Sequence, residues 1–317
     1  MTAQTKLETK KMKSNKSGFI QYFLSNKALY LFILPGLIYL IIFHYVPMYG
    51  VIIAFKDFSI TKGINGSPWV GGENFKYLFE SKQFLTVFKN SIVFSMLRLA
   101  AGFPAPIILA LLLNEVKNMR FKRTVQTVSY IPHFISWVVV CGMVKNIVSP
   151  TAEGIVNAAI KALGGQPIQF LISTFWFRPI IIISEIWKEV GWGAIIYLAA
   201  LSGIDPTLYE AAIVDGASRW QRMVHVTLPG ITSTIIVLLI LRMGRILDNG
   251  FEQIFLLYSP MVYEVADVFE TYTYRTGLIE RRFSYSTAVG LFKAVVGLIM
   301  VYSTNYLARK TGEKALW

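Results

Sequence analysis

A polar, helix-forming stretch, EAAIVDGASRWQRMVHVTLP at residues 210–229, separates two long hydrophobic runs. Just before it, Asp205 and Pro206 form the pattern of an N-cap followed by proline in the first helical position. Gly216 gives the backbone the freedom to turn, and Trp220 lies in a second helical stretch. The sequence therefore predicts two short helices with a turn between them, a knob suited to a groove on a partner protein.

The composition places this knob on a membrane protein. Of the 317 residues, 54% are hydrophobic and only 15% are charged, more apolar surface than a soluble core can hide. The formal charge of +13 could suggest nucleic acid. The basic residues flank apolar runs, however, which disfavours a nucleic-acid interface and favours contact with membrane lipid.

Apolar runs long enough to cross a bilayer recur along the chain. We predict an all-α integral membrane protein with six spans and no cleaved signal peptide. The spans are expected at residues 29–54, 88–114, 126–148, 179–201, 231–257 and 284–307. The corresponding organisation is a basic segment at 1–28, a transmembrane domain at 29–307 containing a loop at 202–230, and a tail at 308–317.

Orientation follows from the distribution of Lys and Arg. The segments on the side of the N-terminus hold 15 of these residues and the opposite loops hold 8. Since cytoplasmic loops carry the excess of positive charge, we expect both termini and the 202–230 loop in the cytoplasm.

The 210–229 stretch resembles the EAA loop of the membrane subunits of binding-protein-dependent ABC importers. The match comprises Glu-Ala-Ala, Gly216 at the family spacing, and a terminal Leu-Pro, with Val226 where isoleucine is usual. Further segments resemble carbohydrate permeases of the lipoprotein-linked polysaccharide type: FHYVPMYGVIIAFKDF (43–58), GFPAPIILALLLNEV (102–116), SYIPHFISWVVV (129–140) and LAALSGIDPTLYEAA (198–212). The likeness covers nearly the whole chain after residue 28.

This resemblance implies a type I importer fold in a bacterial cell membrane, with one extra N-terminal helix before a five-helix core. It implies four partners: a second related permease, an ABC ATPase dimer, an extracellular solute-binding protein and a carbohydrate substrate. The EAA loop would couple to the ATPase. The expected coupling residues are Glu210, Ala211, Ala212, Asp215, Gly216, Leu228 and Pro229.

Catalytic motifs are absent from the sequence. No Gly-Lys dipeptide occurs, so a phosphate-binding P-loop is excluded and ATP with its Mg²⁺ is expected on the partner ATPase. The three histidines, His44, His133 and His225, are far apart, and Cys141 is the single cysteine. We therefore expect no catalytic residue, no metal site and no cofactor in this chain.

Charged residues inside predicted spans mark the candidate substrate site, because such residues usually face a partner or a wet cavity. Glu185, Glu189 and Trp192 lie on one face of the fourth span, where an aromatic ring beside hydrogen-bonding groups suits sugar recognition. The alternative is that Lys188 pairs with Glu185 or a neighbouring helix and only stabilises the bundle. In related permeases this face lines the translocation cavity, which favours a functional role.

A polar interruption of the fifth span gives a second group of candidates. Asp248, Asn249 and Gly250 break an apolar run, and a broken span leaves polar groups available to a ligand. Gln253 extends this group. The alternative is a hinge in which Arg245 pairs with Asp248. The complete predicted substrate set is Glu185, Glu189, Trp192, Asp248, Asn249 and Gln253.

Two other functions are compatible with parts of the pattern. A type I importer of a peptide or amino acid would share the EAA loop but not the first-span and third-span segments at 43–58 and 129–140. A secondary transporter would need an internal repeat, and the two halves of the chain do not match in hydropathy. The favoured function is therefore an ATP-driven importer permease for an oligosaccharide or polysaccharide fragment, and not an enzyme.

Overall fold

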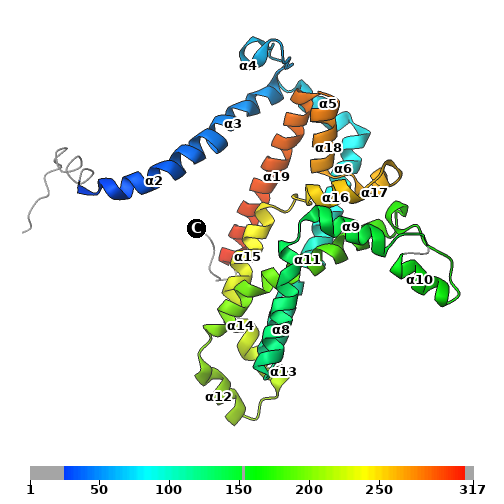
Figure 1. Ribbon diagram of the computed structural model, residues 1–317. Helices are drawn as coiled ribbons and strands as arrows, with labels where there is room; N and C mark the ends of the chain where they lie inside the picture. Colours follow the sequence, from blue (N-terminus) through cyan, green and yellow to red (C-terminus); the bar gives the residue numbers. More distant parts are fainter. Residues whose placement is uncertain (1–24, 152–153, 311–317) are drawn as a thin grey trace, which may run out of the picture. The chain divides into compact units, whose positions relative to one another are not determined.

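The computed structural model describes residues 25–151 and 154–310, which are mainly helical (Figure 1). One isolated antiparallel bridge joins Lys56 and Trp69. The chain divides into two compact units, residues 1–52 and 53–317. Most of the predicted 1–28 segment and of the predicted tail lies outside the described residues.

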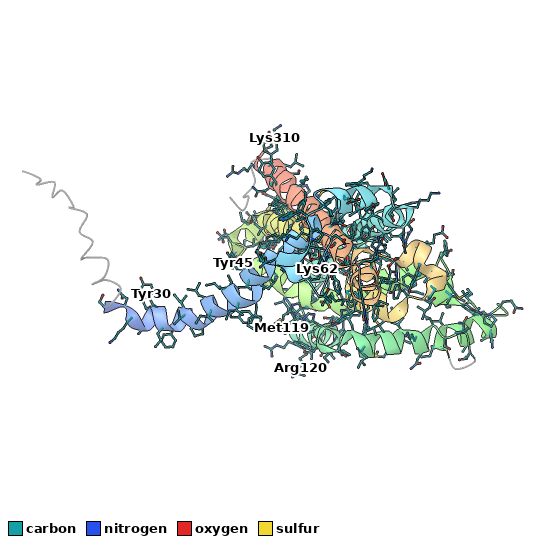
Figure 2. The ribbon with its side chains drawn as sticks, turned by 90° about the horizontal axis from the view of Figure 1, so that it is seen from above. Tyr30, Tyr45, Lys62, Met119, Arg120 and Lys310 are labelled. Atoms are coloured by element: carbon teal, nitrogen blue, oxygen red, sulfur yellow. The ribbon has the colours of Figure 1, made fainter. Side chains whose placement is uncertain are left out.

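The first unit is a single apolar helical run. It consists of α2 (Lys27–Leu40), the π-helix η1 (Ile41–Tyr45), α3 (Val46–Met48) and the start of the 3₁₀-helix η2 (Tyr49–Phe55). No residue of α2 is buried, and side chains project outward all around the helix, as Figure 2 shows near Tyr30 and Tyr45. With η2 included, this run is long and apolar enough to cross a bilayer.

The second unit opens with short elements and then three long helical segments. These are α4 (Gly63–Gly66) and α5 (Glu73–Glu80); α6 (Lys82–Leu97), η3 (Arg98–Gly102) and α7 (Pro104–Glu115); α8 (Met119–Tyr130), η4 (Ile131–Phe134) and α9 (Trp137–Ile147); then α10 (Ile155–Ala162), η5 (Phe170–Ile172) and α11 (Phe177–Ser202). The run from α8 through η4, which contains Pro132, meets α9 at an angle of 104° across the break at residues 135–136. Proline lacks the backbone N–H group that a regular helix needs, which accounts for a bend in this part of the chain.

The remaining elements carry the polar loop and the broken fifth span. They are α12 (Pro206–Val214), α13 (Arg219–Arg222), η6 (Met223–Thr227) and α14 (Leu228–Gly230); α15 (Thr232–Gly244) and α16 (Phe251–Leu257); η7 (Pro260–Val262), α17 (Tyr263–Ala266), α18 (Phe269–Tyr274) and η8 (Arg275–Ile279); and finally α19 (Phe283–Lys310). In Figure 1, α12 and α13 lie at one end of this unit, with α5 and α18 at the other.

Three described helical runs meet the length and hydropathy of a bilayer span, residues 27–55, 82–115 and 283–310, and two bent pairs do so jointly. Helix α11 is 26 residues long but carries Glu185, Lys188 and Glu189 in its central part. A multi-pass, all-α protein is therefore shown, and the number of six spans stays a prediction.

Glycines let α11 pass close to its neighbours. A Cβ atom on Gly191 would lie 2.0 Å from the carbonyl oxygen of Ser129 in α8. A Cβ on Gly193 would lie 2.9 Å from the ring of Pro106 in α7. Small residues at such crossings permit backbone approach, which is what stabilises helix pairs in lipid. These contacts fix the position of the charged middle of α11.

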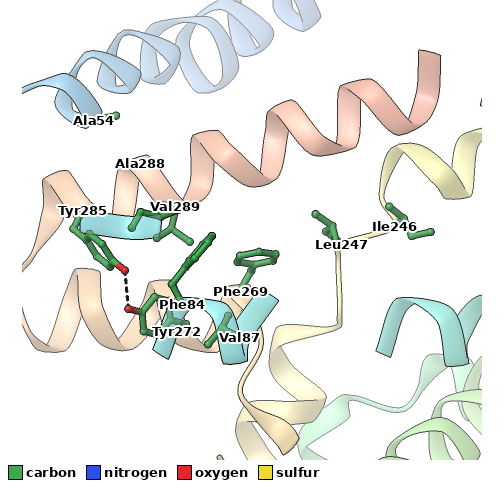
Figure 3. Close-up of a cluster of buried hydrophobic side chains, with 11 residues drawn as sticks. Ala54, Phe84, Val87, Ile246, Leu247, Phe269, Tyr272, Tyr285, Ala288 and Val289 are labelled. Atoms are coloured by element: carbon green, nitrogen blue, oxygen red, sulfur yellow. Dashed lines mark hydrogen bonds between the residues drawn. The ribbon is translucent and has the colours of Figure 1, made fainter. Parts of the chain in front are cut away.

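A buried aromatic cluster holds α6, α18 and α19 together. The ring centroids of Phe84 and Phe269 are 5.8 Å apart, and the hydroxyl groups of Tyr272 and Tyr285 share a 2.9 Å hydrogen bond (Figure 3). All four side chains are at most 5% exposed. Close-packed rings supply the dispersion energy that the hydrophobic effect cannot supply between helices in lipid.

Candidate functional site

A cavity of about 450 Å³ lies beside the charged middle of α11. We call it the α11 cavity. Four of its polar lining residues carry charge: Arg98, Glu185, Glu189 and Arg242. They come from η3, α11 and α15, so helices far apart in sequence converge on one site. Its aromatic lining includes Trp137, Trp192 and Tyr197.

Glu185 is held between two arginines. Its Oε2 atom lies 3.0 Å from Nε of Arg98, and its Oε1 atom lies 3.8 Å from Nη2 of Arg242. The Arg98 side chain is 6% exposed and that of Arg242 is 39% exposed. Arg98 is thus a buried partner of Glu185, whereas Arg242 is the arginine that reaches the open part of the cavity.

Gln253 links this ion pair to two helices. It accepts a 3.1 Å hydrogen bond from Nη2 of Arg98 and donates to the carbonyl oxygen of Ile181 at 2.8 Å and to Oγ of Ser184 at 3.0 Å. Its side chain is almost fully buried. Gln253 therefore positions Arg98, and its amide is fully engaged in the bundle.

Glu189 and Trp192 contact His133, which lies in the short helix η4. Oε2 of Glu189 lies 2.8 Å from Nδ1 of His133, and the indole of Trp192 stacks on the same imidazole. Glu189 and Trp192 remain 39% and 45% exposed. Both residues therefore present surface to the α11 cavity.

Lys188 makes contacts that stabilise the bundle, which is the alternative role considered above for this span. Its Nζ donates to the carbonyl oxygens of His133 at 2.6 Å and Pro132 at 3.3 Å, and lies 3.5 Å from Glu189. The ammonium thus fastens the bend between η4 and α9 to α11. The partner predicted on its own helix, Glu185, is instead paired with arginines.

The three residues at the broken span, Asp248, Asn249 and Gly250, have different surroundings. Asn249 is fully buried and its Nδ2 donates to the carbonyl oxygens of Leu247 and Ser91, at 3.2 and 3.4 Å. Asp248 points away from the α11 cavity and pairs with Lys293 of α19, so the ion pair with Arg245 considered above does not form. Gly250 has φ +66°, and a Cβ there would lie 3.2 Å from the guanidinium of Arg98. Of the six predicted substrate residues, four line one cavity: Glu185, Glu189, Trp192 and Gln253.

The polar loop forms the two predicted helices. Asp205 caps α12 by accepting a 2.9 Å hydrogen bond from the backbone N–H of Thr207, which lowers the pKa of its carboxyl group. The helix ends in a Schellman motif: Gly216 has φ +76° and donates to Ile213, and Ala217 donates to Ala212. Local sequence alone dictates this geometry.

Several large apolar side chains of the loop are exposed. Leu208, Ile213, Val214 and Trp220 are between 53% and 86% exposed. Glu210, Ala211, Asp215 and Gly216 are also exposed, and Glu210 makes no ion pair within the described residues. An exposed apolar patch of this kind marks a docking surface.

A hydrogen bond ties this surface to the fifth span. The hydroxyl groups of Tyr209 in α12 and Thr227 in η6 lie 3.0 Å apart, and Thr227 is buried. Leu228 and Pro229 follow directly and start α14, which leads into α15. The loop is thereby fastened to the segment that reaches the α11 cavity through Arg242.

The family of the chain follows from comparison with known proteins. Residues 102–313 match the family described as the binding-protein-dependent transport system inner membrane component. The chain belongs to this family. It is thus the membrane component of an ABC transporter, a multi-pass subunit without catalytic activity of its own. The matched residues include the complete polar loop and all of the α11 cavity lining except Arg98.

Relatives match this permease almost from end to end. It is 50% identical over 305 residues to the polygalacturonan/rhamnogalacturonan transport system permease protein YteP of Bacillus subtilis strain 168, covering 96% of this chain and 95% of that one. It is 49% identical over 292 residues to Protein LplB of the same strain, covering 92% of each.

A solved structure shows the same fold. The permease resembles a chain of a bacterial ABC transporter that imports the acidic polysaccharide alginate, with a TM-score of 0.86, 46% identity, and coverage of 92% of this chain and 98% of that chain. A second structure of the bacterial alginate transporter, bound to an alginate pentasaccharide-loaded periplasmic protein, matches with a TM-score of 0.87 and 44% identity over 93% and 99% of the two chains.

Several residues that contribute to the α11 cavity or to a neighbouring ion cluster were not predicted from the sequence. Arg98 is a charged residue inside the predicted span 88–114, so the rule that identified Glu185 applies to it equally. His133 and Arg242 could not be assigned to the site from the sequence, because their contacts depend on helices distant in sequence. Glu270 and Lys293, described below, lie respectively in a predicted outer loop and in the last span.

Proposed function

We propose that this permease carries an oligosaccharide or polysaccharide fragment across a bacterial cell membrane. The observation that supports the proposal most strongly is the 44–50% identity, over at least 92% of the chain, to permeases whose names specify saccharides. A peptide or amino acid importer would not explain that similarity. The partial match of other sugar permeases, such as the Rhizobium radiobacter lactose permease LacF at 32% identity over 168 residues, agrees with it.

The α11 cavity is the proposed passage for the sugar. Trp192 offers a half-exposed ring for stacking, Glu189 offers carboxylate oxygens to hydroxyl groups, and Arg242 offers donors. Small-molecule sites combine apolar walls with a few placed polar groups in this way. The ion pair of Arg98 with Glu185 and the amide of Gln253 then hold the wall of the passage in shape.

The polar loop is the proposed coupling element. A separate ATPase dimer, which binds ATP and Mg²⁺, would receive α12 in a groove, and a second related permease would complete the pathway. Closure of the ATPase would move the loop and, through Tyr209, Thr227 and α15, favour the outward-open state. ATP hydrolysis would restore the inward-open state. Such a cycle requires that the partners bind the two states with different affinities.

The solute-binding protein would deliver sugar at the opposite end of the unit, near α5 and α18. We propose that both termini and the coupling loop face the cytoplasm, as the charge distribution predicts.

Reconstitution tests the function directly. The permease is co-expressed with its partner subunits, purified as a complex and placed in proteoliposomes with the solute-binding protein outside. Uptake of a saccharide and its stimulation of ATP hydrolysis support the proposal. Uptake of peptides or amino acids without saccharide uptake would contradict it, and isolation of the permease without an ATPase would contradict the coupling role.

A further inference from the structure

A second cavity, of about 620 Å³, lies on the other side of the broken fifth span. We call it the α19 cavity, and it is bounded by the break after α15, by α18 and by α19. Arg242, Gly250 and Gln253 line the α11 cavity, whereas Arg245, Asp248 and Phe251 line the α19 cavity. Residues in and beside the break between α15 and α16 therefore line both cavities.

The α19 cavity contains an ion cluster with one unused acceptor. Nζ of Lys293 contacts Oδ1 of Asp248 and Oε1 of Glu270, and the backbone N–H of Asn249 donates to the same Glu270 oxygen at 3.2 Å. The other oxygen of Glu270, Oε2, is buried and has no hydrogen-bond partner among the described residues. A buried carboxylate oxygen without a donor is costly, so the cavity favours a ligand that donates a hydrogen bond there.

Arg245 is the matching free cation. It lines the α19 cavity, is exposed, and makes no ion pair or side-chain hydrogen bond with described residues. A guanidinium in a span is costly against lipid, so it faces water or a partner of opposite charge. Its planar fork of donors binds a carboxylate in bidentate fashion.

Aromatic rings complete the lining. Phe251 and Tyr274 contact each other with centroids 5.3 Å apart, and both line the cavity. They offer an apolar surface in the same cavity as Arg245 and Glu270. The volume falls within the roughly 300–1,000 Å³ usual for small-molecule sites.

We propose that the α19 cavity is a second saccharide subsite that binds an acidic sugar unit. Arg245 binds the sugar carboxylate, Oε2 of Glu270 accepts a hydrogen bond from a sugar hydroxyl, and Phe251 with Tyr274 packs against the apolar face of the ring. The inference rests on the proposed saccharide transport and narrows its substrate to an acidic saccharide.

The test compares two charge forms of the same sugars. The complete transporter is reconstituted with its binding protein, and uptake is measured for oligogalacturonate and oligoalginate and for their methyl esters, which keep the hydroxyl groups but lose the carboxylate charge. We compare wild type, Arg245→Gln, Arg245→Lys and the control Arg120→Gln, whose arginine is exposed on α8. Each complex is quantified after purification.

We expect Arg245→Gln to lower uptake of the acidic form about tenfold or more while changing uptake of the ester less than twofold, because only the charged contact is lost. Arg245→Lys should restore part of the acidic preference and Arg120→Gln should match wild type. Equal loss for acid and ester, or no loss for either, would overturn the subsite.

Two further outcomes separate this proposal from the one on which it rests. Wild-type uptake of neutral saccharides alone would overturn the acidic subsite but leave saccharide transport intact; no saccharide uptake by wild type would overturn both. An anionic phospholipid seen by native mass spectrometry on wild type but absent from Arg245→Gln, with unchanged sugar selectivity, would assign the cavity to lipid and overturn the subsite.

Discussion

The indole of Trp192 lies flat on the imidazole of His133, with ring centroids 4.4 Å apart and planes inclined by 1°. The two residues come from α11 and η4, and the same imidazole is hydrogen-bonded to Glu189. One face of the indole is therefore occupied by protein while the residue stays 45% exposed to the α11 cavity. In the proposed passage, this arrangement would pre-orient the ring for stacking against a sugar.

Replacement of Trp192 tests that function. We expect Trp192→Ala to lose stacking of about 1 kcal/mol or more, seen as reduced uptake at limiting saccharide. Assembly and basal ATPase activity should change little, and Trp192→Phe, which keeps an aromatic face, should retain most of the uptake. Poor assembly of both Trp192→Ala and Glu189→Gln would instead assign these residues to the scaffold.

The ion pair of Arg98 and Glu185 predicts a strongly non-additive pair of substitutions. Glu185→Leu leaves the buried Arg98 without its carboxylate and should destabilise the permease by about 3–5 kcal/mol. The double variant Arg98→Met/Glu185→Leu removes both charges and should recover much of that loss. Thermal unfolding of the purified complex in detergent measures both. A double variant whose loss of stability equals the sum of the losses of Arg98→Met and Glu185→Leu, each measured alone, would refute the coupling.

The turn at Gly216 predicts a separation of insertion from coupling. Its φ of +76° is inaccessible to proline, and the Schellman motif needs its N–H group. Gly216→Pro should enter the membrane normally and abolish saccharide-stimulated ATP hydrolysis. Gly216→Asn, which tolerates the left-handed conformation, is the matched control. Normal transport by Gly216→Pro would remove this turn from the coupling element.

Glu210 gives a second test of the coupling surface. It is exposed and free of ion pairs within the described residues, so Glu210→Lys should leave the fold intact. Reversal of its charge should weaken ATPase docking and reduce uptake to background. Co-purification of the ATPase reports on docking. Full retention of the ATPase together with normal uptake would contradict the assignment.

Cysteine labelling tests the orientation. In a Cys141→Ser background, cysteines at Gly66 and Lys161 should react with a membrane-impermeant thiol reagent added outside intact cells. Cysteines at Arg123 and Arg219 should react only after the membrane is opened. All four positions are exposed in the structure, so accessibility reports on sidedness and not on burial. The reverse pattern would place the coupling loop outside the cell.

The sequence by itself determined the features that depend on neighbouring residues. The cap at Asp205, the turn at Gly216 and the break before Gly250 were all predictable, because side-chain capping and positive φ are local properties of the backbone. Membrane class followed from composition, and the candidate residues on α11 followed from their helical spacing. The resemblance of the 210–229 stretch placed these features in a family.

Only the tertiary structure decided which polar group meets which. Asp248 and Asn249 are adjacent, yet one pairs with Lys293 on α19 while the other is buried against α6. Arg98 pairs with Glu185, which lies 87 residues further along the chain. Such pairs depend on which helices approach one another, and that is set by the summed packing of glycines, prolines and rings across the bundle. The local spacing of residues does not determine which helices approach one another.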